Sequence, residues 1–362
     1  MTSPHSPAEE IAGAISPEPG ERGPTHSPAE EIAGAISPEP GERGPTHSPA
    51  EEIAGAISPE PGERGPTHLP AEEIAGATLL ADAVKDATAV LAAAGVPTPA
   101  VDAQLLAAHL LGVSRGELGA MLFGTAVSPV GYEEFVARRA AREPLQHITG
   151  VAYFRHLELA VGKGVFVPRP ETESVVQLGI DFLTQLRQER GDAAKLIAVD
   201  LGTGSGAIAG AMATEVAGSS VYAVELSDDA FDWAAKNLSG TGVTLLHGDM
   251  RDAFAELNGT VDVVVSNPPY IPAAAIPRDL EVRLHDPHMA LYGGGEDGME
   301  MPVAAQATAA RLLHPGGFFV MEHAEVQAAQ MAELFSKSGH WDDVRTHMDL
   351  TGRDRATSGI RR

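Results

Sequence analysis

Apolar residues follow a helical spacing from residue 78 to residue 145. In the first part of this stretch they recur at steps of three and four residues, and Gly95-Val96-Pro97 ends the run. Residues 102–111 and 133–142 repeat the same spacing. We therefore predict a small helical bundle over residues 78–145, which packs against the rest of the chain or docks a substrate.

The spacing changes to that of strands after residue 145. The segments IT, VAYF, LELAV and VFV are rich in β-branched and aromatic residues and predict a β-hairpin linker over residues 146–168. From Lys195 onward, the strand candidates LIAVDLG, VYAVEL, VTLLHGD, VDVVVSNPPY and GGFFVMEH alternate with helical stretches. This alternation predicts an α/β fold over residues 169–362. Its mostly parallel sheet has helices on both faces and ligands at the carboxyl ends of the strands.

The first 77 residues form a tandem repeat. The segment HSPAEEIAGAISPEPGERGPT begins at His5, His26 and His47, and it restarts at His68 before diverging after Ala77. Each copy has only isoleucine and alanine as apolar content and is interrupted by prolines and glycines, so it cannot bury enough surface to fold. We predict a disordered region over residues 1–77, which is either an inert tail or an interaction arm.

The acidity of the chain argues against nucleic acid as a direct partner. The formal net charge is −25, and residues 1–77 contribute 14 acidic residues against three arginines. The remaining 36 acidic and 22 basic residues leave a charge of −14 on the predicted folded part. Binding to phosphate backbones depends on lysine and arginine releasing counterions, so this surface is poorly suited to it.

Cysteine and long apolar runs are both missing from the sequence. With no cysteine, the chain cannot form disulfides, thiolate zinc sites or a cysteine nucleophile. It has no cationic start followed by an apolar run, and no uninterrupted apolar stretch of roughly 18 residues. We expect a soluble, cytoplasmic protein with no membrane partner.

A glycine-rich turn follows the first predicted strand of the α/β region. Gly202-Thr203-Gly204-Ser205-Gly206 comes directly before a predicted helix, and its glycines let a ligand approach the backbone closely. No Gly-Lys-Ser/Thr follows and the G-x-G-x-x-G spacing is missing, so neither a P-loop nor the usual dinucleotide turn is indicated. Asp200 offers a carboxylate instead. The alternative is a purely structural turn between strand and helix.

Two further positions extend this candidate cofactor site. Glu225 ends the next strand about 20 residues on, where a carboxylate can accept both hydroxyls of a ribose. After the third strand, Asp249 is placed to accept from an adenine amino group and Met250 to lie against the ring. An exposed acid at a strand end is the alternative for Glu225, and a plain turn is the alternative for Asp249 and Met250.

A polar tetrad follows the apolar strand VDVVV. Asn267 supplies an amide oxygen, and Pro269 has no N–H and helps to fix the chain so that Pro268 presents its carbonyl. These are two acceptors for one NH₂ group, and Tyr270 adds a ring that packs on a planar amide. The alternative is a tight Asn-Pro turn after a buried strand.

Two acceptors suit a nitrogen that is a poor nucleophile. The lone pair of an amide nitrogen is delocalised into its carbonyl, and no ordinary side-chain base could deprotonate the nitrogen fully. If both N–H bonds point at Asn267 and at the Pro268 carbonyl, the lone pair is directed at the group to be attacked. The tetrad therefore predicts Asn267, Pro268 and Tyr270 as the catalytic residues and Asn267 to Tyr270 as the substrate-binding residues.

Several segments together resemble the release factor glutamine methyltransferases. They are REPLQHITG at residues 142–150, VPRPETE at residues 167–173, DLGTGSGAIA, SNPPYI, HDPHMALYGGGEDG and DLTGRDRATSG. The resemblance covers residues 79–362 and implies a class I, Rossmann-like fold with S-adenosyl-L-methionine as cofactor. It implies that Gly202 to Gly206, Glu225 and Asn267 bind the cofactor. The implied partner is a peptide chain release factor, with the glutamine of its Gly-Gly-Gln loop methylated on the side-chain nitrogen and the N-terminal helices helping to hold it.

The sequence departs from that family at a few positions. Glu225 stands where aspartate is commoner, Met250 where an aromatic residue often lies, and Met321-Glu322-His323 where the family favours Glu-Ile-Gly. Within VPRPETE we expect Arg169, Glu171 and Glu173 to form a capping and salt-bridge cluster at a helix start. The histidines at 285, 288 and 323 lack metal spacing, so no metal site is predicted.

Two other functions remain open on these residues. Adenine-N6 DNA methyltransferases share the Asn-Pro-Pro-Tyr tetrad because they face the same delocalised NH₂, but the net acidity and the missing basic recognition domain oppose this function. The other alternative is a non-catalytic cofactor-binding scaffold that uses the repeats for interaction. The intact tetrad argues against that alternative.

Overall fold

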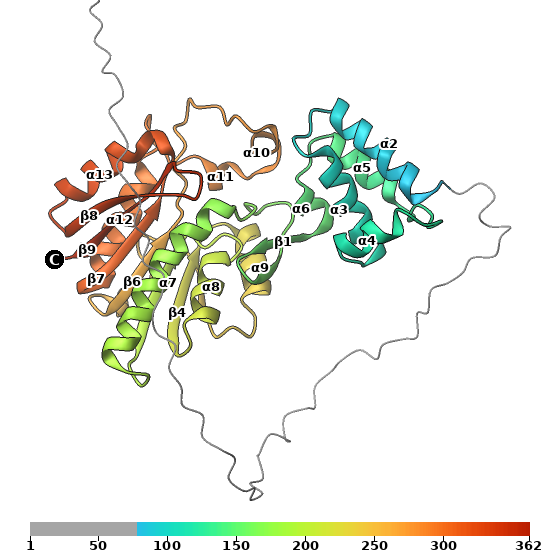
Figure 1. The fold of residues 1–362 in the computed structure, drawn as a ribbon. Helices are drawn as coiled ribbons and strands as arrows, with labels where there is room; N and C mark the ends of the chain where they lie inside the picture. Colours follow the sequence, from blue (N-terminus) through green and yellow to red (C-terminus); the bar gives the residue numbers. More distant parts are fainter. Residues whose placement is uncertain (1–77) are drawn as a thin grey trace, which may run out of the picture. The chain divides into compact units, whose positions relative to one another are not determined.

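The structure is a computed structural model that describes residues 78–362 (Figure 1). The repeats at residues 1–77, for which we predicted disorder, lie outside the described residues. No helix within residues 78–362 is long and apolar enough to cross a membrane.

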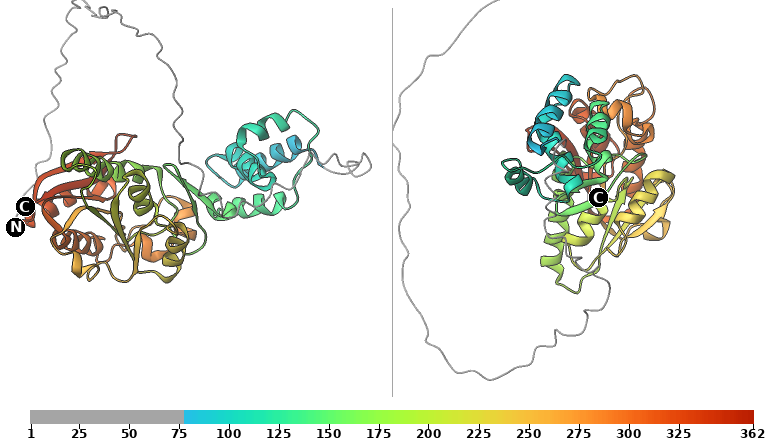
Figure 2. Two further views of the ribbon diagram at one scale, coloured as in Figure 1. Left: turned by 90° about the horizontal axis from the view of Figure 1, so that it is seen from below. Right: turned by 90° about the vertical axis from the view of Figure 1, so that its right-hand side faces the viewer.

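Helices occupy the first described region, as the spacing predicts. They are α2 (Leu80–Ala93), α3 (Pro99–Leu111), α4 (Arg115–Met121) and α5 (Tyr132–Ala140). Leu80, Leu91, Leu106 and Leu118 are fully buried between them, and the Tyr132 hydroxyl donates to the Ala103 carbonyl over 2.8 Å. These contacts give the helices a hydrophobic core of their own, and Figure 2 shows them as one group coloured from blue to green.

The predicted hairpin is shorter than the segment assigned to it. Strands β1 (Val151–Phe154) and β2 (Leu157–Ala160) pair antiparallel, but residues 145–149 form a short helix, α6 (Leu145–Thr149), where we expected extended chain. Pro144 precedes this helix and Gly150, at φ 75°, ends it in the left-handed conformation. These helix signals override the β-branched pair Ile148-Thr149. In the apolar segment at residues 165–167, Val165 and Val167 are buried, but the segment does not form a strand.

A seven-stranded sheet follows in the order β5-β4-β3-β6-β7-β9-β8. Neighbouring strands run parallel from β5 to β7, while β9 pairs antiparallel with both β7 and β8. The fold class is therefore the predicted one, with two further strands that we did not predict, β9 beside β7 and β8 at the edge of the sheet. The strands are β3 (Leu196–Leu201), β4 (Ser219–Glu225), β5 (Thr244–His247), β6 (Val261–Ser266), β7 (Leu313–Glu322), β8 (Trp341–Met348) and β9 (Asp354–Arg361).

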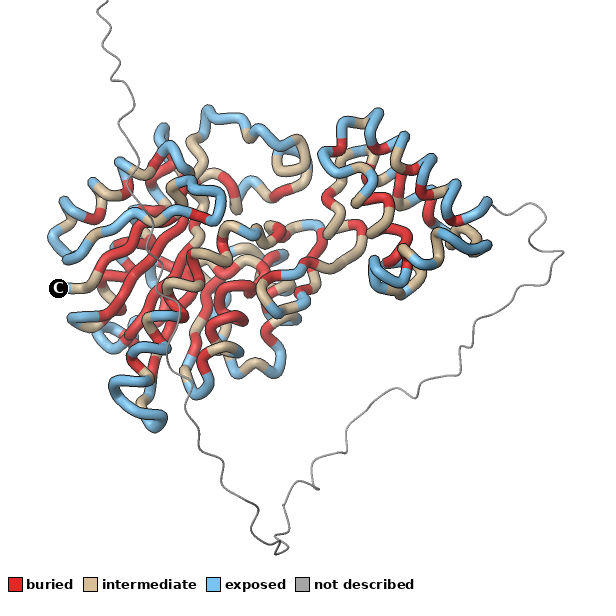
Figure 3. The backbone as a smooth tube through the Cα atoms, in the orientation of Figure 1, coloured by how far each residue is buried: buried red, intermediate tan, exposed pale blue. Residues whose placement is uncertain are grey.

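Helices cover both faces of this sheet. Alternate residues of the central strands enter two separate cores: Val263 and Val265 pack in the core that includes α7 and α8, whereas Val264 packs in the core that includes α12 and α13. Figure 3 shows the resulting buried positions, in red, along the strands. The remaining elements are α7 (Pro170–Arg190), α8 (Ala207–Glu215), α9 (Asp228–Asn237), η1 (Ala255–Leu257), α10 (Leu280–His285), α11 (His288–Leu291), α12 (Glu300–Leu312), η2 (Glu325–Gln327) and α13 (Ala328–Lys337).

Candidate active site

The register of the parallel strands brings three predicted site residues and one residue that we did not predict into one row. Leu201 at the end of β3 lies opposite Val224 of β4 and Ser266 of β6, and Ser266 lies opposite Met321 of β7. The residues that come next in each strand are Gly202, Glu225, Asn267 and Glu322. Strand β4 lies on one side of β3 and β6 lies on the other, so the strand order reverses at β3 and the row spans this point. Open α/β sheets bind ligands at such a point.

A cavity of about 600 Å³ opens above this row. Its volume is in the range of sites for small molecules and cofactors. It is lined by eleven of the twelve residues predicted for the site, which are Gly202, Thr203, Gly204, Ser205, Glu225, Asp249, Met250, Asn267, Pro268, Pro269 and Tyr270. Gly206 is the exception, because it precedes α8 and faces Leu238, whose Cγ would lie 2.9 Å from a Cβ at that position.

The glycine turn is shaped by backbone contacts. Gly202 and Thr203 both donate to the Val224 carbonyl over 3.0 Å, and Gly202, Gly204 and Gly206 all have positive φ. Asp200, in which we saw a possible ligand group, is fully buried and does not line the cavity. It accepts from the Thr203 hydroxyl and the Ala209 N–H, so it holds the turn against α8. Burial raises the pKa of Asp200 to about 7.

Glu225 is fixed at the edge of the cavity by three backbone amides. One carboxylate oxygen accepts from the Gly204 N–H over 2.8 Å, and the other accepts from the N–H groups of Leu226 and Ser227 over 2.9 and 2.8 Å. The side chain is therefore not the exposed acid of the alternative reading, since the residue is 9% exposed. A carboxylate has about four acceptor positions, two on each oxygen, so one position stays free for a ligand hydroxyl, on the oxygen that accepts from Gly204.

Asp249 and Met250 lie on the same side of the cavity. Asp249 Oδ1 accepts from the backbone N–H of Arg251 over 2.9 Å and from its Nε over 3.1 Å. Met250 is 7% exposed and packs in the core beneath the glycine turn. The Asp252 N–H donates to the Asp249 carbonyl over 3.2 Å, so the plain turn that we considered as an alternative is present. The contact of Asp249 and Met250 with an adenine stays a prediction.

The tetrad is tied to a buried carboxylate that the sequence did not single out. Asn267 Nδ2 donates to Thr172 Oγ1 over 3.3 Å, and the Thr172 hydroxyl donates to Glu322 Oε2 over 2.6 Å. The Tyr270 hydroxyl donates to the other oxygen, Glu322 Oε1, over 3.3 Å. Glu322 is 2% exposed, and burial raises its pKa to about 7. Burial also raises the pKa of the Tyr270 phenol.

Two acceptors of the tetrad belong to residues that line the cavity. Within residues 78–362, no donor is hydrogen-bonded to the Pro268 carbonyl or to Asn267 Oδ1. Both residues line the cavity together with Tyr270. That these two oxygens accept from one NH₂ group stays a prediction.

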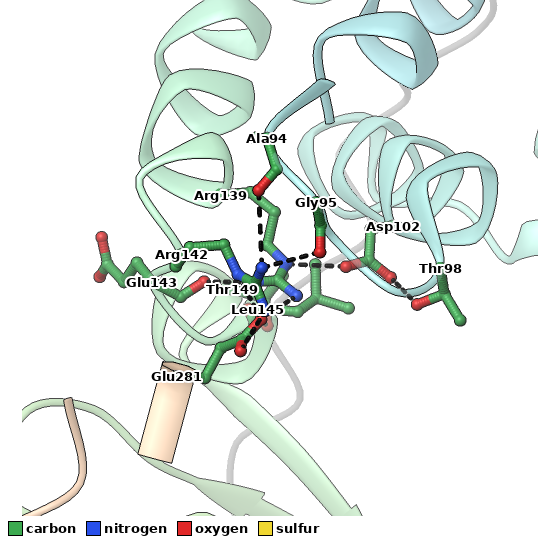
Figure 4. Close-up of polar contacts among 10 residues, drawn as sticks. All are labelled: Ala94, Gly95, Thr98, Asp102, Arg139, Arg142, Glu143, Leu145, Thr149 and Glu281. Carbon is green, nitrogen blue, oxygen red and sulfur yellow. Dashed lines mark hydrogen bonds and ion pairs between the residues drawn. The ribbon is translucent and has the colours of Figure 1, made fainter. Parts of the chain in front are cut away.

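The segment after the tetrad lines the cavity and is held to the N-terminal helices by an ion-pair cluster. Glu281 of α10 accepts from Arg142 Nε over 2.9 Å and from Arg142 Nη2 over 2.5 Å, and it accepts from Arg139 Nη2 over 2.9 Å (Figure 4). Arg139 also donates to Asp102 Oδ2 over 2.7 Å. Burial alone would raise the pKa of Glu281, but the hydrogen bonds from Arg142 and Arg139 lower it to about 2.

The start of α7 differs from the cluster we expected there. The helix begins at Pro170, as predicted, but Arg169 pairs with Asp286 over 2.9 Å and not with Glu171 or Glu173. Glu173 instead accepts from the Arg155 N–H over 3.0 Å. Asp286 is buried, and its burial raises its pKa to about 6 in spite of Arg169. Partners distant in sequence therefore replace the local pairs that we expected, and of these three carboxylates only Asp286 is buried.

The histidines take packing roles where the structure shows their contacts. His323 is fully buried, with Nδ1 at 2.9 Å from the Ala324 carbonyl and Nε2 at 2.9 Å from Thr357 Oγ1. The His288 ring packs at a tilt against Tyr292, with centroids 5.1 Å apart. Across the described part of the chain, no group of three or more histidine, aspartate or glutamate side chains is placed to hold a metal ion.

Two family models match parts of the chain. The model described as "PrmC N-terminal domain" matches residues 82–150, and the model described as "Methyltransferase small domain" matches residues 173–296. The first match covers the N-terminal helices up to α6. The second covers the glycine turn, Glu225 and the tetrad.

Relatives with known names match most of the chain. A release factor glutamine methyltransferase of Streptomyces coelicolor is 52% identical over 76% of this chain and 96% of its own length. A 4-amino-L-phenylalanine/4-methylamino-L-phenylalanine methyltransferase of Streptomyces pristinaespiralis is 44% identical over 73% of this chain and 90% of its own length. Among solved structures, a release-factor-specific protein-(glutamine-N5) methyltransferase of Alicyclobacillus acidocaldarius is 28% identical, covering 56% of this chain and 98% of that one at a TM-score of 0.35.

Proposed function

Since the chain belongs to the family of release factor glutamine methyltransferases, we propose that it methylates the side-chain amide nitrogen of a glutamine in a peptide chain release factor. The acceptor glutamine is the one in the Gly-Gly-Gln loop that the resemblance implies. The observation that carries the proposal is the pair of open acceptors, Asn267 Oδ1 and the Pro268 carbonyl, in the cavity beside the glycine turn. That pair suits an NH₂ group on a planar amide.

S-adenosyl-L-methionine is the methyl donor of this family. When bound, it supplies an electrophilic methyl group on a sulfonium. The residues of this chain fit such a cofactor: the positive φ angles of Gly202 and Gly204 open the turn to close approach, and Glu225 keeps one acceptor position for a ribose hydroxyl. We assign Asp249 and Met250 to the adenine.

The tetrad residues carry the acceptor side of the reaction. Asn267 Oδ1 and the Pro268 carbonyl accept one N–H bond each, which turns the nitrogen lone pair toward the methyl group, and Tyr270 packs on the amide plane. With S-adenosyl-L-methionine bound, the new N–C bond would form as the bond from its methyl carbon to sulfur breaks. The nitrogen then carries an extra proton, which is acidic and leaves to solvent, so no strong base is needed.

A second candidate acceptor is an aromatic amine on a small molecule. It is favoured by the 44% identity to an enzyme named for 4-amino-L-phenylalanine. An aryl amine also has an NH₂ group with a delocalised lone pair, so the same two acceptors would orient it. The acidic charge of the chain gives no support to a nucleic acid as the acceptor.

The test is transfer of a labelled methyl group from S-adenosyl-L-methionine. The full-length protein is incubated with a release factor, with the same factor carrying alanine in place of its loop glutamine, and with 4-amino-L-phenylalanine. Label on the intact release factor alone supports the proposal. Label on the amino acid alone would transfer the assignment to the second candidate, and label on the altered factor would refute the glutamine as the acceptor.

A further inference from the structure

A buried chain of hydrogen bonds ends at the Asn267 amide. It starts at Glu322, passes through the Thr172 hydroxyl at 2.6 Å and reaches Asn267 Nδ2 at 3.3 Å. Glu322 and Thr172 are 2% and 5% exposed, so water does not compete for these bonds. The proposed reaction uses Asn267 and Tyr270 but gives no role to either of the buried residues.

When Glu322 is ionised, counting donors and acceptors fixes the direction of every bond in this chain. An ionised carboxylate can only accept, so Glu322 takes the single proton of the Thr172 hydroxyl. The Thr172 oxygen can then only accept from Asn267, and the end of the Asn267 amide that faces it is the NH₂ end. The carbonyl oxygen Oδ1 is thereby directed away from Thr172, as an acceptor.

We propose that Glu322 and Thr172 are positioning residues that hold the Asn267 amide in the orientation in which Oδ1 accepts a hydrogen bond from the substrate NH₂. The inference rests on the proposed function, since it presumes an NH₂ acceptor. In the opposite orientation, the Asn267 NH₂ would face the substrate NH₂. Two donors cannot hydrogen-bond to one another, so one of the two bonds that orient the lone pair would be lost.

The protonation state of Glu322 controls the direction of the chain. Burial raises the pKa of Glu322 to about 7, with Arg355 of β9 lowering it and Glu171 of α7 raising it. Tyr270 donates to Oε1, and the adjacent His323 is engaged with Thr357 and Ala324. A protonated Glu322 can donate to Thr172, which frees the threonine proton for Asn267 Oδ1 and lets the amide turn. We therefore expect kcat to rise as pH rises through about 7.

The experiment compares kcat and cofactor affinity in three threonine variants. Thr172→Val removes the acceptor for Asn267 Nδ2 and should lower kcat by about tenfold to 100-fold, while the Kd of S-adenosyl-L-methionine changes much less. Thr172→Ser keeps the hydroxyl and should recover most of that loss. Thr308→Val is the matched control, because Thr308 of α12 is 3% exposed but does not line the cavity.

A pH profile of kcat with Glu322→Gln completes the test. A glutamine does not ionise, so the variant should lose the rise of kcat with pH that the wild-type protein shows. Wild-type kcat in Thr172→Val, or an unchanged pH profile in Glu322→Gln, would overturn the positioning role while leaving the proposed function intact. Failure of the wild-type protein to methylate any NH₂ acceptor would overturn the proposed function and this inference together.

Discussion

Replacement of Arg139 by methionine should destabilise the N-terminal helices strongly. The Arg139 and Asp102 side chains are 7% and 6% exposed, and their Nε–Oδ2 distance is 2.7 Å. Without the guanidinium, Asp102 keeps only the Thr98 hydroxyl, and Glu281 loses one of its two arginine partners. Removing one partner of a buried ion pair costs about 3–5 kcal/mol, because the other charge stays buried and uncompensated.

The neighbouring Arg138 provides a matched control. It lies in the same helix and pairs with Glu143 over 2.6 Å, but the two side chains are 35% and 25% exposed. An ion pair so open to solvent contributes only about 0–1 kcal/mol, so Arg138→Met should cost far less than Arg139→Met. Methionine is a good helix former, so neither variant loses stability through helix propensity.

Denaturant unfolding followed by two signals measures the difference. Both tryptophans, Trp233 and Trp341, lie in the α/β region, so their fluorescence reports that region, while circular dichroism also reports the N-terminal helices. In Arg139→Met, helical signal should be lost at lower denaturant than in Arg138→Met. The reasoning about buried charge is refuted if the two variants unfold at the same denaturant concentration.

Three further outcomes follow from the same contacts. Gly293→Ala should lower the free energy of unfolding, measured by thermal unfolding, by about 3 kcal/mol, because the added Cβ would lie 2.0 Å from the Gly298 carbonyl oxygen. Gly119→Ala in α4 is the control, since its Cβ meets nothing within 4 Å and the change should be neutral or stabilising. Glu225→Gln should raise the Kd of S-adenosyl-L-methionine about tenfold by calorimetry, since a glutamine has one acceptor oxygen where the carboxylate has two. The pKa of Glu281 is lowered to about 2 in the folded protein. The ionised Glu281 therefore stabilises the fold above the unfolded pKa of this side chain, near 4.5, and this stabilisation is lost as pH falls toward 2. Acid titration followed by the helical signal measures the loss.

The parts of the site that the sequence predicted are those whose chemistry is local. The glycine turn and the tetrad are each contiguous, and each directly follows an apolar strand, so their residue types and their place at the sheet edge can be inferred together. Of the twelve residues predicted for the site, which also include Glu225, Asp249 and Met250, eleven line one cavity. Gly206 does not line the cavity because it packs on Leu238, and this contact depends on how α8 and α9 pack against each other.

Carboxylates show the limit of that inference. Asp200 and Glu225 both lie at the end of a strand beside the glycine turn, and the sequence offered both as ligand groups. Asp200 is inside β3 and is enclosed by Thr203 and Ala209, while Glu225 is the last residue of β4 and reaches the cavity. One or two positions along a strand decide which acid meets a ligand, and strand ends are the least certain feature of a sequence-based prediction.

Glu322 could not be found from the sequence because its partners are set by register. It lies 150 positions from Thr172 and 52 from Tyr270 along the chain, and no motif joins them. The pairing of Ser266 with Met321 puts the residues after them, Asn267 and Glu322, at the same height on adjacent strands. A shift of one residue would turn Glu322 to the other face of the sheet. The orientation of the Asn267 amide therefore depends on how β6 and β7 align. The tetrad can be recognised in the sequence, but the residues that orient its amide cannot.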